Sequence, residues 1–191
     1  MVAGHFGFAA IVKSRAPRAP LWALMLATQW MDVLFVPMFL AHLEPMEVVP
    51  GADPGYGKML IHAEYTHSLI GALVLASLFG LVAAIWWGQR TGAVLGGVVF
   101  SHWLIDLVVH REDMPIFPGG AGPHLGFGLW RAPVVTAVSE LALVVVGAYL
   151  YWRAAVRVSL AADVAPRRAH LVAALVLVGG VAVLAMNLAG S

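Results

Sequence analysis

Long apolar runs decide the fold of this chain, and one of them reads LIHAEYTHSLIGALVLASLFGLVAAIWW from Leu60 to Trp87. A run of about 20 mostly apolar residues is long enough to cross the hydrocarbon core of a membrane as a helix. Comparable runs occupy about residues 21–41, 92–109, 133–152 and 170–188. The sequence therefore predicts an all-α integral membrane protein. We expect a bundle of about five transmembrane helices that forms a single domain over residues 1–191.

The composition excludes several classes of protein. Apolar residues make up 61% of the chain and charged residues 11%, whereas about 25% of the residues in a typical soluble domain are charged. The 11 basic and 10 acidic residues nearly balance, which argues against a nucleic-acid partner. Because the chain has no cysteine, it can form neither disulfides nor thiolate metal sites.

Residues 1–12 are also apolar, but this stretch is too short to span a membrane. It lacks the leading basic residues and the small-residue cleavage site of a secretory signal peptide. We therefore expect a short N-terminal re-entrant or interfacial segment in front of the five spans.

Basic residues are distributed unevenly between the two ends of the predicted bundle. One end collects Lys13, Arg15, Arg18, Arg90, Arg153, Arg157, Arg167 and Arg168, and the other has Lys58, Arg111 and Arg131. Cytoplasmic loops of membrane proteins retain more lysine and arginine than external loops. We expect a multi-pass protein of the bacterial inner (plasma) membrane in which residues 13–18 are cytoplasmic. The loops at 42–59 and 110–132 then face the periplasmic or extracellular side.

Ionisable residues fall at a similar depth in four of the predicted spans. At a rise of about 1.5 Å per residue, they lie roughly 6–13 Å below the outer surface. These residues are Asp32, Glu64, His67, His102, Asp106 and Glu140. Ionisable side chains are costly inside a membrane and usually face the bundle interior, so each is a candidate site residue.

Helical spacing favours the same grouping. His102, Asp106 and His110 follow one another at intervals of four residues, so they are expected to form one stripe. Glu64 and His67 are three apart and are expected to share a helix face. Imidazole and carboxylate ligands without a thiolate suit Zn²⁺ or Mn²⁺. Any single one of these side chains could instead hydrogen-bond a neighbouring helix. We expect His110, at the membrane interface, to be a solvated histidine.

Two motifs resemble those of a known family. They are His62-Ala-Glu-Tyr-Thr-His-Ser68 and Ser101-His-Trp-Leu-Ile-Asp106. They resemble the His-Arg-Gly-x-Thr-His-Ser and Ser-His-x-Leu-Leu-Asp stretches of the YdjM-like inner-membrane proteins, often called membrane-bound metal-dependent hydrolases. The early histidine of that family would be His5, and Asp32 stands alone where the family has Pro-Asp-x-Asp.

The resemblance implies a divalent ion, Zn²⁺ or Mn²⁺, and a hydrolytic reaction. Asp32, His67, His102 and Asp106 would hold the ion, with His62 or His5 as a further ligand. We expect Glu64 or Glu140 to be the general base. The depth of these residues favours a membrane lipid or a lipid-linked ester or phosphoester as the substrate.

Two other functions stay open at this point. The chain could be a non-catalytic accessory subunit of a larger membrane complex, in which substitutions at Glu64 and Glu140 would be tolerated. It could also transfer electrons through a b-type haem held by His67 and His102, which would give a Soret band.

Overall fold

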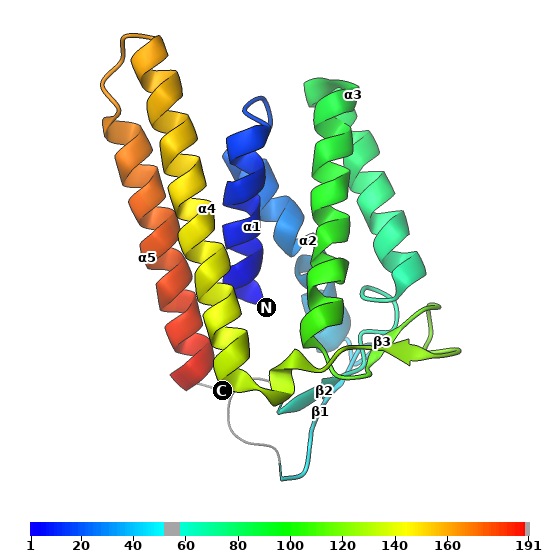
Figure 1. Ribbon diagram of the computed structural model, residues 1–191. Helices are drawn as coiled ribbons and strands as arrows, with labels where there is room; N and C mark the ends of the chain where they lie inside the picture. The colour runs from blue at the N-terminus through cyan, green and yellow to red at the C-terminus, as the bar shows by residue number, and fades with distance from the viewer. Residues whose placement is uncertain (52–57, 190–191) are drawn as a thin grey trace.

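The computed structural model describes residues 1–51 and 58–189. The described residues form five α-helices: α1 (Val2–Arg15), α2 (Leu21–Leu40), α3 (Leu69–Val109), α4 (Pro133–Ala161) and α5 (Arg167–Ala189). The helices stand side by side, and α1 contacts α2, α4 and α5 in the interior of the bundle (Figure 1). The prediction of an all-helical bundle is confirmed.

Four of these helices, α2 to α5, are long and apolar enough to cross a membrane. Large apolar side chains are exposed on their outer faces, for example Leu81, Ile85, Val134 and Leu175. Water would penalise so much exposed apolar surface, whereas lipid would not. The fold is therefore compatible with a multi-pass membrane protein.

Helix α3 is a hairpin of two antiparallel helices. Gly88 has a φ of +81°, a backbone conformation that favours glycine, and the chain reverses there (Figure 1). The two halves, residues 69–87 and 89–109, approach closely because small residues line their contact. A Cβ atom on Gly92 would lie 2.5 Å from the carbonyl oxygen of Gly80. This hairpin accounts for the second and third predicted spans.

The first half of α3 begins at Leu69, later than the predicted start at Leu60. Ser68 caps the helix by accepting a hydrogen bond from the backbone N–H of Gly71 at 3.0 Å. The predicted first residues of this span are not helical, because Met59–Ile61 form strand β2, which pairs antiparallel with strand β1 (Met46–Val48). Glu64 and His67 therefore lie in the turn-rich segment 62–68, and the prediction that they share a helix face is wrong.

Residues 1–12, expected to form a re-entrant or interfacial segment, lie in α1, a helix of 14 residues that packs against α2, α4 and α5. Its contact with α4 is made by glycines, because a Cβ on Gly147 would lie 2.2 Å from the carbonyl oxygen of Gly7. Small side chains allow the two backbones to approach, which carries the first turns of α1 into the interior. His5 is fully buried as a result.

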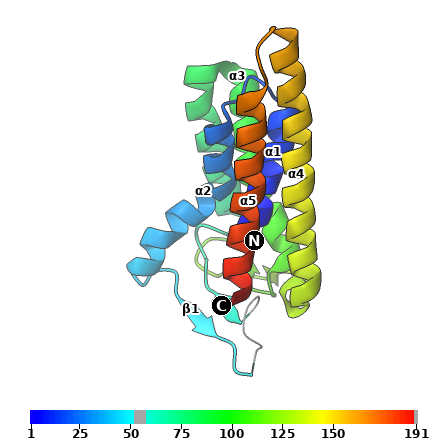
Figure 2. The same ribbon diagram turned by 90° about the vertical axis from the view of Figure 1, so that its left-hand side faces the viewer.

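Two pairs of short strands and a 3₁₀ helix lie at one end of the bundle (Figures 1 and 2). They are the β1–β2 hairpin, the pair formed by β3 (Met114–Pro115) and β4 (His124–Leu125), and the 3₁₀ helix η1 (Leu129–Arg131). The α1–α2 loop, the turn at Gly88 and the α4–α5 loop lie at the opposite end (Figure 1). The loops that carry most of the basic residues therefore lie together at one end of the bundle, and the described residues of the loops at 42–59 and 110–132 belong to the other end.

Candidate metal centre

Ionisable side chains from four segments meet in the interior, near the end of the bundle that carries the β-strands. They are His5 of α1, Asp32 of α2, His67 before α3, and His102 and Asp106 of the second half of α3. Among the described residues they form two overlapping sets: His5, His102 and Asp106; and Asp32, His67 and His102. The ligand atoms of each set lie within 4.8 Å of one another. Of the six residues predicted to share one layer, Asp32, His67, His102 and Asp106 therefore lie together in these sets.

His102 lies at the centre of this cluster. Its Nε2 atom is 3.0 Å from Asp106 Oδ2, 3.3 Å from His67 Nε2 and 3.6 Å from Asp32 Oδ1. His67 Nε2 is also 3.5 Å from Asp32 Oδ1. Four ligands bound tetrahedrally through bonds of about 2.0–2.1 Å lie about 3.3 Å apart. The separations among Asp32, His67 and His102 match three such ligands around one small divalent ion, while Asp106 Oδ2 lies 4.0 Å from His67 Nε2.

The backbone of α2 fixes the tautomer of His102. Nδ1 of His102 lies 2.6 Å from the carbonyl oxygen of Thr28, and this contact is fully buried. A carbonyl oxygen can only accept, so the proton is on Nδ1. The lone pair of a neutral His102 is then on Nε2, where it faces the cluster.

A hydrogen-bond relay fixes His67 in the same way. The hydroxyl of Thr66 lies 2.8 Å from Glu44 Oε2 and 2.9 Å from His67 Nδ1. An ionised carboxylate only accepts, so Thr66 donates its proton to Glu44 and accepts from His67 Nδ1. Glu44 Oε1 also accepts from the backbone N–H groups of Tyr65 and Thr66, which holds the turn in place. His67 therefore also presents its Nε2 lone pair to the cluster.

These assignments leave acceptors facing acceptors. Two imidazole lone pairs and two carboxylates converge. The N-terminal ammonium group of Met1 lies 3.6 Å from Asp106 Oδ1, but neutral imidazoles in these tautomers supply no proton between His67 Nε2, His102 Nε2 and Asp32 Oδ1. A buried group of acceptors is costly unless a cation or a proton joins it. Protein metal sites use the same arrangement, in which outer hydrogen bonds orient each histidine and leave the inner nitrogen free.

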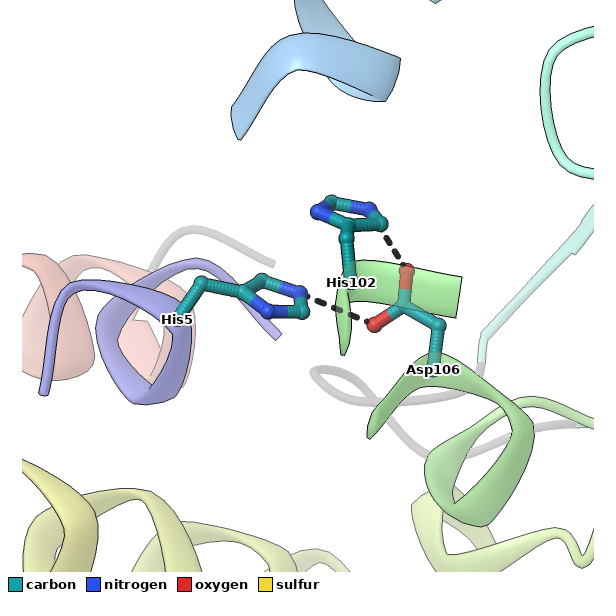
Figure 3. Close-up of side chains that lie close together, drawn as sticks. All are labelled: His5, His102 and Asp106. Atoms are coloured by element: carbon teal, nitrogen blue, oxygen red, sulfur yellow. Dashed lines mark hydrogen bonds and ion pairs between the residues drawn. The ribbon is translucent and has the colours of Figure 1, made fainter. Parts of the chain in front are cut away.

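His5 approaches Asp106 from the other side. Its Nε2 atom lies 3.0 Å from Asp106 Oδ1, while His102 contacts Oδ2 of the same carboxylate (Figure 3). The His5 and His102 rings are stacked, with centroids 4.0 Å apart. Because Nδ1 of His102 is bonded to Thr28, Nε2 is the nitrogen left for a metal. The two overlapping sets therefore share one ligand atom, His102 Nε2, and a single lone pair binds one metal, which indicates a single ion with ligands from both sets.

His110 is a buried neighbour of the cluster, so the prediction that it is a solvated histidine is wrong. It is 5% exposed, and its Nε2 atom lies 3.7 Å from Asp106 Oδ2. Its Nδ1 atom lies 3.0 Å from Asp113 Oδ1, and its ring packs against Trp130 at 4.2 Å between centroids. Asp113 is fixed in turn by the backbone N–H of Ile61. The i, i+8 spacing from His102 was the sequence signal for this position.

Three predicted site residues belong to neither ligand set within the described chain. Glu64 lies against Gly120, where a Cβ would be 2.7 Å from the Glu64 carboxyl carbon. Glu140 is buried and accepts a hydrogen bond from the backbone N–H of Gly4 at 3.0 Å. His62 is partly exposed and lies 3.7 Å from Glu47. The structure thus gives Glu140 a role in holding the start of α1 and places Glu64 and His62 outside the cluster.

A cleft of about 720 Å³ opens onto the cluster. Asp32, His67, Asp106 and His110 contribute to its lining. Its other walls are largely apolar and include Phe35, Val36, Met46, Met59 and Met186, with Lys58 among them. The side chain of Asp32 is 37% exposed, so the cluster is accessible from this cleft.

Comparisons with known proteins add no further assignment: no family model matches the chain, and no curated protein or solved structure matches it either.

Proposed function

We propose that this chain is a membrane-embedded, metal-dependent hydrolase that acts on a lipid-linked ester or phosphoester. The observation that carries the proposal is the pair of opposed histidines, His67 and His102, whose Nε2 atoms lie 3.3 Å apart beside two carboxylates. A single divalent ion, Zn²⁺ or Mn²⁺, bound to His102 Nε2 would draw these four groups together. Its ligands would be Asp32, His67, His102 and Asp106.

A metal ion at this position would polarise a carbonyl or phosphoryl oxygen and lower the pKa of water. The chain itself supplies the group that moves the proton. His110 lines the cleft, lies in neither ligand set, and is oriented by the carboxylate of Asp113. A histidine held by a buried carboxylate is a suitable general base. We therefore assign this role to His110 in place of Glu64 and Glu140.

The cleft favours an amphiphilic substrate. Its apolar walls suit an acyl or isoprenoid chain, and Lys58 offers a cation to a phosphate or another anionic group. A substrate entering from the membrane would reach the cluster without leaving an apolar environment. This arrangement supports a lipid-linked ester or phosphoester over a soluble polymer.

The resemblance to the YdjM-like proteins supports the hydrolase assignment, and the distribution of lysine and arginine supports the orientation in the membrane. The motif residues His67, His102 and Asp106 are among those that meet in the cluster. The site lies at the end opposite the loops that carry most of the lysines and arginines, so we place it toward the periplasmic or extracellular side of a bacterial inner membrane.

The haem alternative is disfavoured by a distance. Two axial nitrogens on opposite sides of a metal, each bound at about 2 Å, lie about 4 Å apart. His67 and His102 are closer than this, at 3.3 Å, and carboxylates occupy the space around them.

Metal content tests the proposal. The detergent-purified protein is loaded with ZnCl₂ or MnCl₂, desalted and analysed for bound metal, alongside His102→Ala, Asp106→Asn and the control His124→Ala. His124 lies exposed on β4, so its substitution removes a histidine outside the cluster. We expect about one equivalent in the wild type and control and a loss of at least tenfold in the other two variants. A metal-free wild type would overturn the proposal and favour an accessory subunit.

Hydrolysis is then tested on the metal-loaded protein with fluorogenic phospholipids that carry either an ester or a phosphoester reporter. We expect turnover in the wild type and in His124→Ala and none in His102→Ala. A metal-loaded wild type without turnover on either substrate class would contradict the hydrolase assignment while leaving the metal site intact.

A further inference from the structure

The end of the bundle opposite the metal centre is strongly cationic. The α1–α2 loop, the turn at Gly88 and the α4–α5 loop lie at this end (Figure 1). These segments and the helix ends beside them carry Lys13, Arg15, Arg18, Arg90, Arg153, Arg157, Arg167 and Arg168. Among the described carboxylates, Asp163 in the α4–α5 loop lies at this end. The positive charge is therefore largely uncompensated, which attracts anionic surfaces and ligands.

Three of these arginines surround one cavity. The cavity has a volume of about 380 Å³ and lies between the α1–α2 loop and the start of the second half of α3. Arg15 lines it from the end of α1, Arg18 from the loop, and Arg90 from the turn after Gly88. Thr91 and the backbone around Ala16 and Pro17 complete the walls.

The arginines of this pocket are not neutralised by the protein. Within residues 1–51 and 58–189, the ion pairs join other groups, and none includes Arg15, Arg18 or Arg90. Like charges placed around a shared cavity repel one another, and an anion in the cavity removes that repulsion. Guanidinium groups also match phosphate oxygens through paired N–H donors.

The loop that follows Arg15 and carries Arg18 is held in place. The ammonium group of Lys13 donates to the carbonyl oxygens of Pro17 and Ala19, both at 2.8 Å. Ala19 is buried against the bundle, and Pro17 restricts the backbone between the two arginines. The pocket is therefore formed before any ligand arrives, which reduces the entropic cost of binding.

Two tryptophans near the pocket indicate that it lies at the level of the lipid headgroups in a membrane. Trp22 lies in the first turn of α2 and Trp86 precedes the turn at Gly88, and both indoles are exposed. Tryptophan collects at the level of lipid headgroups. Basic pockets between transmembrane helices at this level bind phosphate-bearing headgroups.

We propose that the pocket formed by Arg15, Arg18 and Arg90 binds the phosphate of an anionic phospholipid headgroup. It lies at the far end of α1 from His5 and shares no lining residue with the cleft at the metal centre. The inference is therefore independent of the proposed hydrolase activity.

Native mass spectrometry of the detergent-solubilised protein tests this site. The protein is titrated with phosphatidylglycerol or with phosphatidylcholine of the same acyl chains. The pocket variant is Arg18→Gln with Arg90→Gln. The control is Arg167→Gln with Arg168→Gln, which removes the same charge at the same end from residues outside the cavity. All four arginines are exposed, so both variants should fold, as circular dichroism and gel filtration will show.

We expect the wild type and the control to retain one phosphatidylglycerol about tenfold more tightly than phosphatidylcholine, and the pocket variant to lose this preference. An equal loss in both double variants would overturn the proposal in favour of a diffuse surface charge. Retention by the pocket variant would also overturn it. Displacement of the lipid by glycerol 3-phosphate at matching concentration would identify a soluble phosphate ligand instead of a lipid.

Discussion

His67 and His102 face each other through Nε2 atoms 3.3 Å apart, although they are 35 positions apart in the chain. Each ring is oriented by a hydrogen bond from its Nδ1 atom. His67 donates to the Thr66 hydroxyl, and His102 donates to the Thr28 carbonyl oxygen. Both contacts direct a lone pair into the same space. The capacity of the site to bind a metal therefore depends on residues that do not touch the metal.

The first prediction concerns Thr66. Thr66→Val keeps the shape of the side chain but removes the acceptor that holds the His67 Nδ1 proton and breaks the link to Glu44. We expect zinc affinity to fall about 10- to 100-fold, the usual cost of losing an outer partner of a metal-bound histidine. Competition with a fluorescent zinc chelator measures this affinity.

Thr66→Ser is the matched control because it restores the hydroxyl while lacking the methyl group. Its zinc affinity should be close to that of the wild type. Equal losses in the valine and serine variants would show that packing, and not the hydrogen bond, is what Thr66 contributes.

The second prediction is that one ion binds per chain and that His5 positions a ligand. His5 hydrogen-bonds Asp106 Oδ1, which directs Oδ2 toward His102 and His67. In His5→Ala we expect one equivalent of zinc, bound about tenfold more weakly than in the wild type. Elemental analysis of the zinc-saturated proteins gives the stoichiometry. Two equivalents in the wild type and one in His5→Ala would instead identify His5 as a ligand of a second ion.

The third prediction separates the proposed general base from the ligands. His110→Gln should retain metal because His110 lies outside both ligand sets. Its turnover should fall about 10²- to 10⁴-fold, the contribution of a positioned acid–base group. Asp113→Asn should act in the same direction through the orientation of His110. Parallel measurements of metal content and turnover distinguish this role from ligation, since a ligand would lose metal as well.

The sequence was sufficient to locate the second half of α3 and its polar stripe. Fully apolar runs and the four-residue spacing of His102 and Asp106 are local properties, and a helix converts them directly into a shared face. The convergence of Asp32 with these residues also followed, because ionisable groups in apolar helices turn toward the interior of a bundle.

The turn at residues 62–68 could not be predicted from local pattern. Its conformation depends on Glu44, a residue about twenty positions earlier that binds the backbone of Tyr65 and Thr66. The same long-range contacts move Glu64 away from the cluster while leaving His67 within it. Likewise, the burial of α1 depends on Gly147 of α4, and that pairing is not visible in residues 1–12.

The last prediction tests whether the packing of α1 on α4 is as tight as its glycines indicate. A Cβ atom at Gly147 would lie 2.2 Å from the carbonyl oxygen of Gly7, a backbone atom that cannot move without shifting the whole helix. Gly147→Ala should therefore destabilise the detergent-solubilised protein by about 1–3 kcal/mol. Thermal unfolding followed by circular dichroism gives the change.

Gly97→Ala is the matched control for this substitution. Gly97 also lies within a long helix, but it is exposed and no atom lies within 4 Å of a Cβ built there. Because alanine has the higher helix propensity, this variant should be as stable as the wild type or up to about 1 kcal/mol more stable. Since α1 carries His5, Gly147→Ala should also weaken zinc binding, whereas Gly97→Ala should not. Equal stability of the two variants would mean that α1 can move off α4 at no cost, which is incompatible with the enclosed position of His5.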